Sequence, residues 1–167
     1  MRLKDRVAII TGSSQSIGKA VAIRFAQEGA KVVVNYLSNK LLADKVVEYI
    51  KQQGGEAFAF GANVANESEV KAMVDETVKR YGRIDILVNN AAIDPRKIWH
   101  EITVEEWDHI MTNNVRSQFV CAKAVYPHMR DRNYGKIINV SSVTFWTGQK
   151  GYVHYVASKG AIIGFTR

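Results

Sequence analysis

The sequence predicts an α/β domain built on a doubly wound parallel sheet, with helices on both faces in a three-layer αβα arrangement. Two observations support this fold class. Apolar, β-branched runs alternate with amphipathic helical stretches along all 167 residues. The apolar runs are also continuous, as expected of strands that are buried on both faces. The length suits a single domain over 1–167, and no stretch approaches the ~20 apolar residues that a membrane-spanning helix needs.

The predicted elements alternate strictly along the chain. Strands are expected at residues 7–11, 31–35, 56–60, 84–88 and 136–140. Helices are expected from about residue 18 to Gly29, over 40–53, over 67–81, from about 104 to 132, and from near Tyr152 onward. Longer loops separate them at 89–102 and 141–151. Asn66–Glu69 and Thr103–Glu106 have the capping-box pattern of a helix start.

The composition excludes several functional classes. The net charge of +7 comes from scattered Lys and Arg residues without a basic run or interleaved aromatics, so no nucleic-acid partner is predicted. A single cysteine, Cys121, excludes an internal disulfide and is expected to be a packed thiol. No signal peptide precedes the first strand, so a cytoplasmic location is expected. No metal site is predicted, because ligand spacing is lacking among His100, His109, His128 and His154.

A glycine-containing turn joins the first strand to the first helix. It reads Gly12-Ser13-Ser14-Gln15-Ser16-Ile17-Gly18, and the strand at 31–35 follows the helix. This βαβ unit is typical of a Rossmann-like dinucleotide-binding domain, because glycines let the backbone approach a pyrophosphate at a helix N-terminus. Polar residues also follow the later strands, which predicts that one ligand site lies at the carboxyl ends of the strands.

Tyr155 and Lys159 lie four residues apart in the last predicted helix, thirteen residues after Ser142. Residues four apart share a helix face, so the Lys159 charge is expected to lower the pKa of the phenol. A phenol tuned in this way can exchange a proton with an alcohol or carbonyl oxygen, which Ser142 would hold. Taken alone, the same spacing also fits a half-buried aromatic beside a solvated lysine.

Together these motifs resemble the short-chain dehydrogenase/reductase family over the whole chain, with 3-oxoacyl-carrier-protein reductases and glucose dehydrogenases as similar members. The family's Thr-Gly-x-x-x-Gly-x-Gly corresponds to residues 11–18, and its Asn-Asn-Ala-Gly corresponds to residues 89–92. Its active-site Asn corresponds to Asn114, which the spacing to Trp107 favours over Asn113. Trp107 itself is expected to pack in the core.

The chain departs from the family pattern at three places. Ser16 replaces the middle glycine of the turn, Ala92 replaces the last glycine of the second motif, and Asn63-Val64 stands where the family has Asp-Val against the adenine ring. The Ser16 side chain is expected either to crowd the pyrophosphate and weaken cofactor binding or to cap the helix.

The resemblance implies an NAD(P)-dependent oxidoreductase that interconverts a secondary alcohol and a ketone, acting on a small-molecule carbonyl or alcohol substrate as a homo-oligomer (dimer or tetramer). It implies that Tyr155 is the acid/base and that Lys159 tunes it and binds the ribose. Ser142 would bind the substrate oxygen, and Asn114 would hold a water that links Lys159 to solvent. The implied cofactor-binding residues are Gly12, Ser14, Gln15, Ser16, Ile17, Gly18, Asn35, Tyr36, Ser38, Asn63, Val64, Asn90, Ala91, Ala92, Tyr155 and Lys159.

Two further expectations concern specificity. No acidic residue follows the second strand, which favours NADP over NAD and leaves dual use open. A 2′-phosphate could be received by Asn35, Tyr36, Ser38 and Lys40, although Lys40 also fits a solvated residue at a helix start. The substrate pocket is expected to be lined by 94–99 and 143–154, with a partly aromatic wall of Trp99, Trp146 and His154.

The resemblance also bears on length. Family members typically run to about 250 residues, so the domain is expected to be truncated after the fifth strand and the start of the following helix. The fifth strand would then be an exposed edge. The alternative function is therefore a non-catalytic nucleotide-binding remnant.

Overall fold

A computed structural model describes residues 1–167, and it contains one sheet of five parallel strands. The strands lie in the order β3-β2-β1-β4-β5. The strand order reverses between β1 and β4, and open α/β sheets bind ligands at such a point. This topology confirms the doubly wound parallel sheet. The strands are β1 (Val7–Ile10), β2 (Lys31–Tyr36), β3 (Glu56–Gly61), β4 (Ile86–Asn89) and β5 (Lys136–Asn139).

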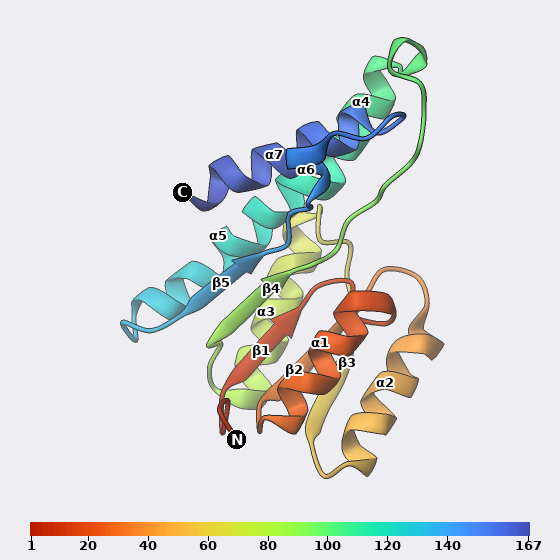
Figure 1. The fold of residues 1–167 in the computed structure, drawn as a ribbon. Helices are drawn as coiled ribbons and strands as arrows, with labels where there is room; N and C mark the ends of the chain where they lie inside the picture. Colours follow the sequence, from red (N-terminus) through yellow and green to blue (C-terminus); the bar gives the residue numbers. More distant parts are fainter.

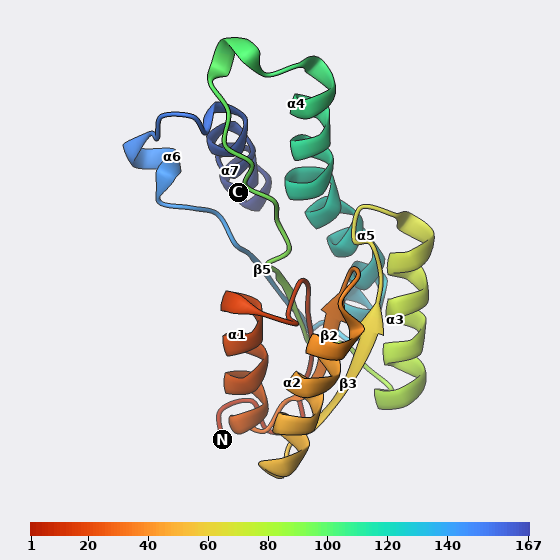
Figure 2. The ribbon, with the colours of Figure 1, turned by 90° about the vertical axis from the view of Figure 1, so that its right-hand side faces the viewer.

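Helices cover both faces of this sheet (Figures 1 and 2). One buried cluster joins the α1 and α2 side chains to one face of the strands, including Ala8 and Ile10. A second cluster joins α3 and α5 to the opposite face, including Ile9, because side chains alternate along a strand. The helices are α1 (Ser16–Gln27), α2 (Lys40–Gln52), α3 (Glu67–Tyr81), α4 (Val104–Met111), α5 (Ser117–Arg130), α6 (Thr144–Thr147) and α7 (Val153–Thr166).

Local structure differs from the sequence prediction in three places. The helix expected over 104–132 is interrupted by a π-helical segment, η2 (Thr112–Arg116). The two expected loops contain short helical turns, η1 (Trp99–Glu101) and α6. The apolar pattern of the sequence does not reveal this segment. A π-helical turn is a single wider turn within an α-helix, and the helix on each side of it keeps the ordinary spacing of apolar residues.

The two predicted capping boxes have different outcomes. The box at Thr103 is confirmed, with both reciprocal bonds to Glu106 present. At the start of α3 only half of the box forms: the Asn66 side chain caps the helix, but the Glu69 carboxylate accepts a hydrogen bond from the backbone N–H of Asn63 (2.7 Å) instead. The chain folds back between β3 and α3, and this brings Asn63 within reach of the carboxylate.

Two single-residue expectations can also be checked against burial. Cys121 is buried in α5, and burial raises the pKa of its thiol to about 12, so it is a packed thiol as predicted. The prediction that Trp107 packs in the core is wrong, because its side chain is 37% exposed on α4. The apolar face of α4 that enters the core is narrow, and Ile110 is its only fully buried member.

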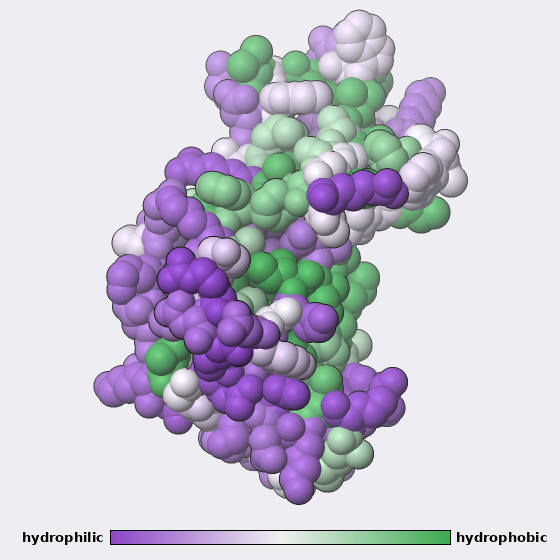
Figure 3. Space-filling view, turned by 90° about the vertical axis from the view of Figure 1, so that its left-hand side faces the viewer, coloured by the Kyte–Doolittle hydropathy of each residue, from purple (hydrophilic) through white to green (hydrophobic).

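Strand β5 forms one edge of the sheet, and its side chains are more exposed than those of the other strands. Ile137 and Ile138 are 37% and 45% exposed, whereas all four residues of β1 and of β4 are buried. The exposed edge was predicted. Figure 3 shows apolar surface gathered on this side of the molecule. No helix here combines the length and apolar character that crossing a membrane requires.

Candidate nucleotide-binding and active site

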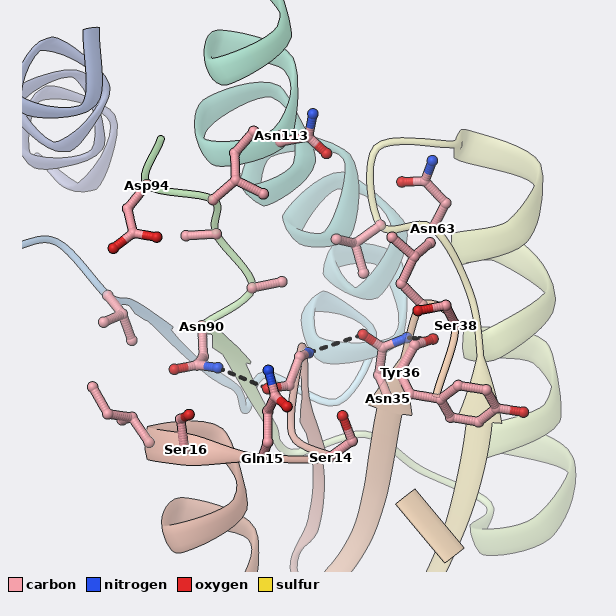
Figure 4. A pocket seen from close by; sticks show the side chains of 18 of the residues that line it. Ser14, Gln15, Ser16, Asn35, Tyr36, Ser38, Asn63, Asn90, Asp94 and Asn113 are labelled. Atoms are coloured by element: carbon pink, nitrogen blue, oxygen red, sulfur yellow. Dashed lines mark hydrogen bonds between the residues drawn. The ribbon is translucent and has the colours of Figure 1, made fainter. Parts of the chain in front are cut away.

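A cleft of about 790 Å³ opens at the carboxyl ends of the strands. Its walls come from the β1–α1 turn, the end of β2, the segments after β3, β4 and β5, and one face of α7. Every predicted cofactor residue lines it except Gly18, and Ser142 lines it too. Asn113 lines the cleft, whereas Asn114 does not. Figure 4 shows the cleft from Tyr36, Ser38 and Asn63 at one end to Asp94 at the other.

The β1–α1 turn requires glycine at two positions. Gly12 has φ +60°, and a Cβ there would lie 3.0 Å from the Ala91 Cα. Gly18 is not strained, but a Cβ on it would lie 2.4 Å from the Gly12 carbonyl oxygen and 2.6 Å from the Asn90 Nδ2. The helix that follows has no side-chain N-cap and no acidic residue in its first turn. A phosphate therefore fits this helix start, which offers free N–H groups and a positive dipole end.

Asn90 ties this turn to the end of β4. Its Nδ2 donates to the carbonyl oxygens of Thr11 (3.0 Å) and Gly12 (3.1 Å). Figure 4 shows the Asn90 side chain pointing toward the β1–α1 turn. Thr11 completes the link, because its Oγ1 accepts from the N–H groups of Asn90 and Ala91. The sequence analysis did not assign Thr11 a role. Its position directly before the glycine turn was the available signal.

Ser16 begins α1 with φ +50°, in the left-handed region that favours glycine. The N-cap of α1 is Gln15, and the Ser16 hydroxyl makes no hydrogen bond to the helix. The cap alternative is therefore wrong, and Ser16 instead lines the cleft at the start of the helix (Figure 4).

The end of β2 carries the residues expected to receive a 2′-phosphate, and they differ in availability. The Asn35 side chain is bonded to protein on both sides: Oδ1 accepts from the Gly12 N–H (3.0 Å), and Nδ2 donates to the Ala62 carbonyl (3.1 Å). Asn35 therefore shapes the cleft floor and is not free to bind a phosphate. Tyr36 lies against Gly61, and Ser38 lines the cleft.

Lys40 stands outside the cleft. Its Nζ donates to the Asp44 carboxylate at 2.6 Å, and this hydrogen bond raises the pKa of Lys40. This geometry favours the interpretation of Lys40 as a solvated residue at a helix start. Farther along the cleft, Asn63 holds a tight turn through its Oδ1, which accepts from the Ala65 N–H (3.0 Å), and Val64 lines the wall beside it.

Tyr155 and Lys159 occupy one face of α7, and both line the cleft. The Lys159 side chain is only 2% exposed; its Nζ donates to the Val140 carbonyl at 2.9 Å and lies 5.5 Å from the centroid of the Tyr155 ring. Burial lowers the pKa of Lys159, and the negative charge of Asp94 opposes that shift. A buried cation is thus held beside the phenol, which rules out a solvated lysine at this position.

Two adjacent serines follow β5, and their hydrogen bonds separate them. The Ser141 hydroxyl donates to the backbone carbonyl of Lys159 (2.7 Å), so it anchors α7. The Ser142 Oγ accepts from the backbone N–H and the hydroxyl of Thr144, at 3.2 and 2.9 Å. The proton of the Ser142 hydroxyl therefore remains available to an oxygen in the cleft.

Asn114 lies in the π-helical segment η2 and is fully buried. Its Oδ1 accepts from the Ile93 N–H, and its Nδ2 donates to the Ile93 carbonyl and to the Ser158 hydroxyl, at 2.8, 2.8 and 3.0 Å. The amide joins the loop after β4 to α7, directly behind Lys159. A water beside Lys159 would thus have to use the backbone of Asn114, because its side chain is occupied by protein groups.

The predicted aromatic substrate wall is absent from the cleft. Trp99 and Trp146 are 69% and 73% exposed, and neither lines it. His154 is buried on α7 with its Nδ1 unpartnered, and burial lowers its pKa. Of the residues in the two predicted substrate ranges, 94–99 and 143–154, only Asp94 lines the cleft. The 143–154 segment extends away from the sheet (Figure 2). No three His, Cys, Asp or Glu side chains gather to hold a metal ion.

Comparison with known proteins identifies the family to which this fold belongs. A sequence model of the short chain dehydrogenase family matches residues 6–167. The chain is 42% identical over 160 residues to 3-oxoacyl-(acyl-carrier-protein) reductase FabG of Staphylococcus aureus, covering 96% of this chain and 65% of the relative. It is 42% identical over 165 residues to the 3-oxoacyl-(acyl-carrier-protein) reductase of a Synechocystis species, covering 99% and 67%.

A solved structure gives the same result. The crystal structure of a short chain dehydrogenase from Mycobacterium avium superposes with a TM-score of 0.93 at 32% identity, covering 99% of this chain and 62% of that one. The chain therefore belongs to the short-chain dehydrogenase family. It spans about two thirds of the length of the curated relatives that it matches.

Proposed function

We propose that this chain is the nucleotide-binding and catalytic part of an NAD(P)-dependent oxidoreductase that interconverts a secondary alcohol and a ketone. The observation that carries the proposal is the buried Lys159 ammonium, held 5.5 Å from the Tyr155 ring on the wall of a cleft that fits a dinucleotide. The relatives are 3-oxoacyl-(acyl-carrier-protein) reductases by name, so a 3-oxoacyl thioester is one candidate substrate. The resemblance to glucose dehydrogenases makes a sugar the second candidate.

Four side chains have different roles in the proposed reaction at the substrate carbonyl. The nicotinamide, when bound, supplies or accepts the hydride. Tyr155 gives its phenolic proton to the carbonyl oxygen during reduction and takes it back during oxidation. The buried Lys159 ammonium lies 5.5 Å from the centroid of the Tyr155 ring, and its hydrogen bond to the Val140 carbonyl keeps it in place. Ser142 donates its free hydroxyl proton to the same substrate oxygen, and Asn114 keeps α7 in register with the loop after β4.

The end of β2 supports a preference for NADP over NAD. No carboxylate lines this part of the cleft, so nothing there pairs with two ribose hydroxyls or repels a 2′-phosphate. Ser38 and Asn39 line it with polar groups, while Lys40 is held by Asp44. The cleft provides no dedicated cation for a phosphate, so the preference is expected to be modest and NAD is expected to bind as well.

An assembly of several copies is part of the proposal. Trp107 on α4 and two aromatic residues on α5, Phe119 and Tyr126, are exposed. The resemblance implies that subunits contact one another partly through the two long helices near Trp107 and Tyr155, and exposed aromatic side chains support this part of the proposal, because aromatic residues are enriched in subunit interfaces.

The test pairs nucleotide titration with a tyrosine variant. NADPH and NADH are titrated into the purified chain by fluorescence, and NADPH oxidation is then followed with ketones, 3-oxoacyl thioesters and sugars. Tyr155→Phe is expected to reduce turnover by about 10³-fold and to leave NADPH affinity nearly unchanged, because only the proton donor is lost. Tyr152→Phe, one helical turn away and outside the cleft lining, is the matched control.

Two outcomes contradict the proposal. If neither nucleotide binds, the cleft is not a dinucleotide site. If NADPH binds but no carbonyl compound is reduced, the chain is the non-catalytic nucleotide-binding protein considered above, and the strained Ser16 at the start of α1 is the feature that favours that alternative.

A further inference from the structure

Asp94 is a charged residue of the cleft that has no role in the proposed reaction. Asp94 follows Ile93, whose N–H and carbonyl are both held by Asn114. The loop is thus fixed one residue before the carboxylate. Asp94 lies at the end of the cleft opposite to the β2 terminus (Figure 4), where its charge acts on Lys159.

The Asp94 carboxylate has no ion pair or hydrogen bond within the chain, although Arg96 and Lys97 follow it closely in sequence. Lys97 is turned toward α4, where its Nζ pairs with Glu106 at 2.8 Å. Arg96 lies over the Tyr152 ring, 5.6 Å from its centroid. A third cation, Lys159, is buried and donates to the Val140 carbonyl. Asp94 is exposed on the cleft wall, and no protein group occupies its acceptor atoms, so a ligand in the cleft can reach them.

We propose that Asp94 is a specificity-determining residue that directs the cleft toward neutral polyhydroxylated ketones and alcohols, such as sugars and polyols, and against anionic substrates. This inference rests on the proposed function and concerns the substrate of that same site. A carboxylate accepts two or more hydrogen bonds from vicinal hydroxyl groups. It repels a carboxylate or phosphate group on a substrate of similar size, and a specificity device of this kind works by repulsion as much as by attraction.

The local electrostatics agree with this assignment. The negative charge of Asp94 reaches Lys159, where it opposes the loss of the ammonium charge. Both side chains line the cleft, Asp94 on the loop after β4 and Lys159 on α7. A hydroxylated substrate that reaches both would meet hydrogen-bond acceptors on Asp94 and the proton-transfer groups on α7.

The experiment compares ligands on the nucleotide-saturated protein, so that it does not depend on turnover. A four-carbon polyol and a four-carbon hydroxy acid are titrated into the NADP⁺ complex of the wild type, Asp94→Asn and Asp108→Asn, with ligand-observed NMR as the readout. Asp108 is the matched control, because it is an exposed acid on α4 outside the cleft. The kcat/KM ratio for the corresponding ketones is measured alongside.

The wild type is expected to prefer the polyol, and Asp94→Asn is expected to reduce the polyol-to-acid affinity ratio on the order of tenfold, while Asp108→Asn leaves it unchanged. An unchanged ratio in Asp94→Asn, an equal change in both variants, or no polyol binding to the wild type would overturn the assignment. Normal NADP⁺ binding with any of these results removes only the role of Asp94, whereas absent NADP⁺ binding removes the proposed function together with it.

Discussion

The two ends of the cleft are built in different ways. At the nucleotide end, hydrogen bonds of the Asn35 and Asn90 amides join the end of β2 and the segments after β1, β3 and β4 to one another. The strands beneath are buried along their whole length at β1 and β4. At the substrate end, β5 is half exposed, and the 143–154 segment carries an exposed Trp146.

This difference shows where rigidity originates. The nucleotide end is over-determined, because several loops share the same few amide groups and a change in one disturbs the others. At the substrate end, Asn114 holds the loop before Asp94, and Ser141, Lys159 and Asn114 join α7 to the segments after β5 and β4, beside a strand that is largely exposed. We therefore expect substitutions at the nucleotide end to affect cofactor binding most, and those at the substrate end to affect stability and specificity.

The largest effect is expected for Gly18→Ala. The added Cβ would meet backbone and the Asn90 amide at distances that no real Cβ tolerates, so the turn must shift. We expect a loss of about 3 kcal/mol in the free energy of unfolding and an NADPH affinity lower on the order of 100-fold. The measurements are urea denaturation and fluorescence titration. Gly164→Ala is the control, because its Cβ would meet nothing within 4 Å. Similar behaviour of the two variants would contradict the close packing at Gly18.

A smaller effect is expected for Asn114→Ala. The substitution leaves the partly buried Ile93 N–H and carbonyl without partners and removes the buried hydrogen bond to Ser158, which together costs about 2 kcal/mol in the free energy of unfolding. Asn113→Ala is the control, since the Asn113 amide bonds only to His109 in its own helix. Thermal unfolding of both variants is the measurement. If Asn113→Ala is the more destabilising of the two, the link between α7 and the β4 loop does not stabilise the substrate end.

The smallest effect is expected for Ser16→Gly. A left-handed backbone costs a non-glycine residue roughly 1–2 kcal/mol, and the greater chain entropy of glycine offsets about 0.5–1 kcal/mol of that gain. The net stabilisation is expected to be about 0.5 kcal/mol, with a severalfold rise in NADPH affinity as the cleft wall opens. Ser14→Gly, in the same turn at negative φ, should stabilise nothing. An unchanged or weaker NADPH affinity in Ser16→Gly would show that the Ser16 side chain does not hinder the pyrophosphate.

The sequence predicted the sheet and most of its helices because each signal was local. A buried run such as residues 31–35 needs no partner to be recognised as a strand, and Gly82 after a helical pattern predicts a helix end without further context. The spacing of Tyr155 and Lys159 also specifies their shared helix face. Ser142 and the glycine turn could be brought to the same cleft from strand order alone, since parallel strands end at one edge.

The predictions that differ from the structure concern side chains whose contacts are made by segments far away in the sequence. Asn35 was expected to meet a phosphate, but its amide is bonded to Gly12 and Ala62, which come from two other loops. Trp107 was expected in the core, but α4 presents only a narrow buried face. Trp146 and His154 were expected to form one wall, yet one is exposed and the other is buried.

The sequence by itself determined the fold class, the order of elements and the identity of the chemical groups, because periodicity, glycine placement and residue spacing act within a few positions of the chain. The tertiary structure decided which hydrogen-bonding atoms remain available in the cleft. It holds Asn35, Asn114 and Ser141 in structural bonds and leaves Ser142 and Asp94 open. That choice depends on contacts between segments that are far apart in sequence, and a buried polar group takes whichever partner the packing brings within reach.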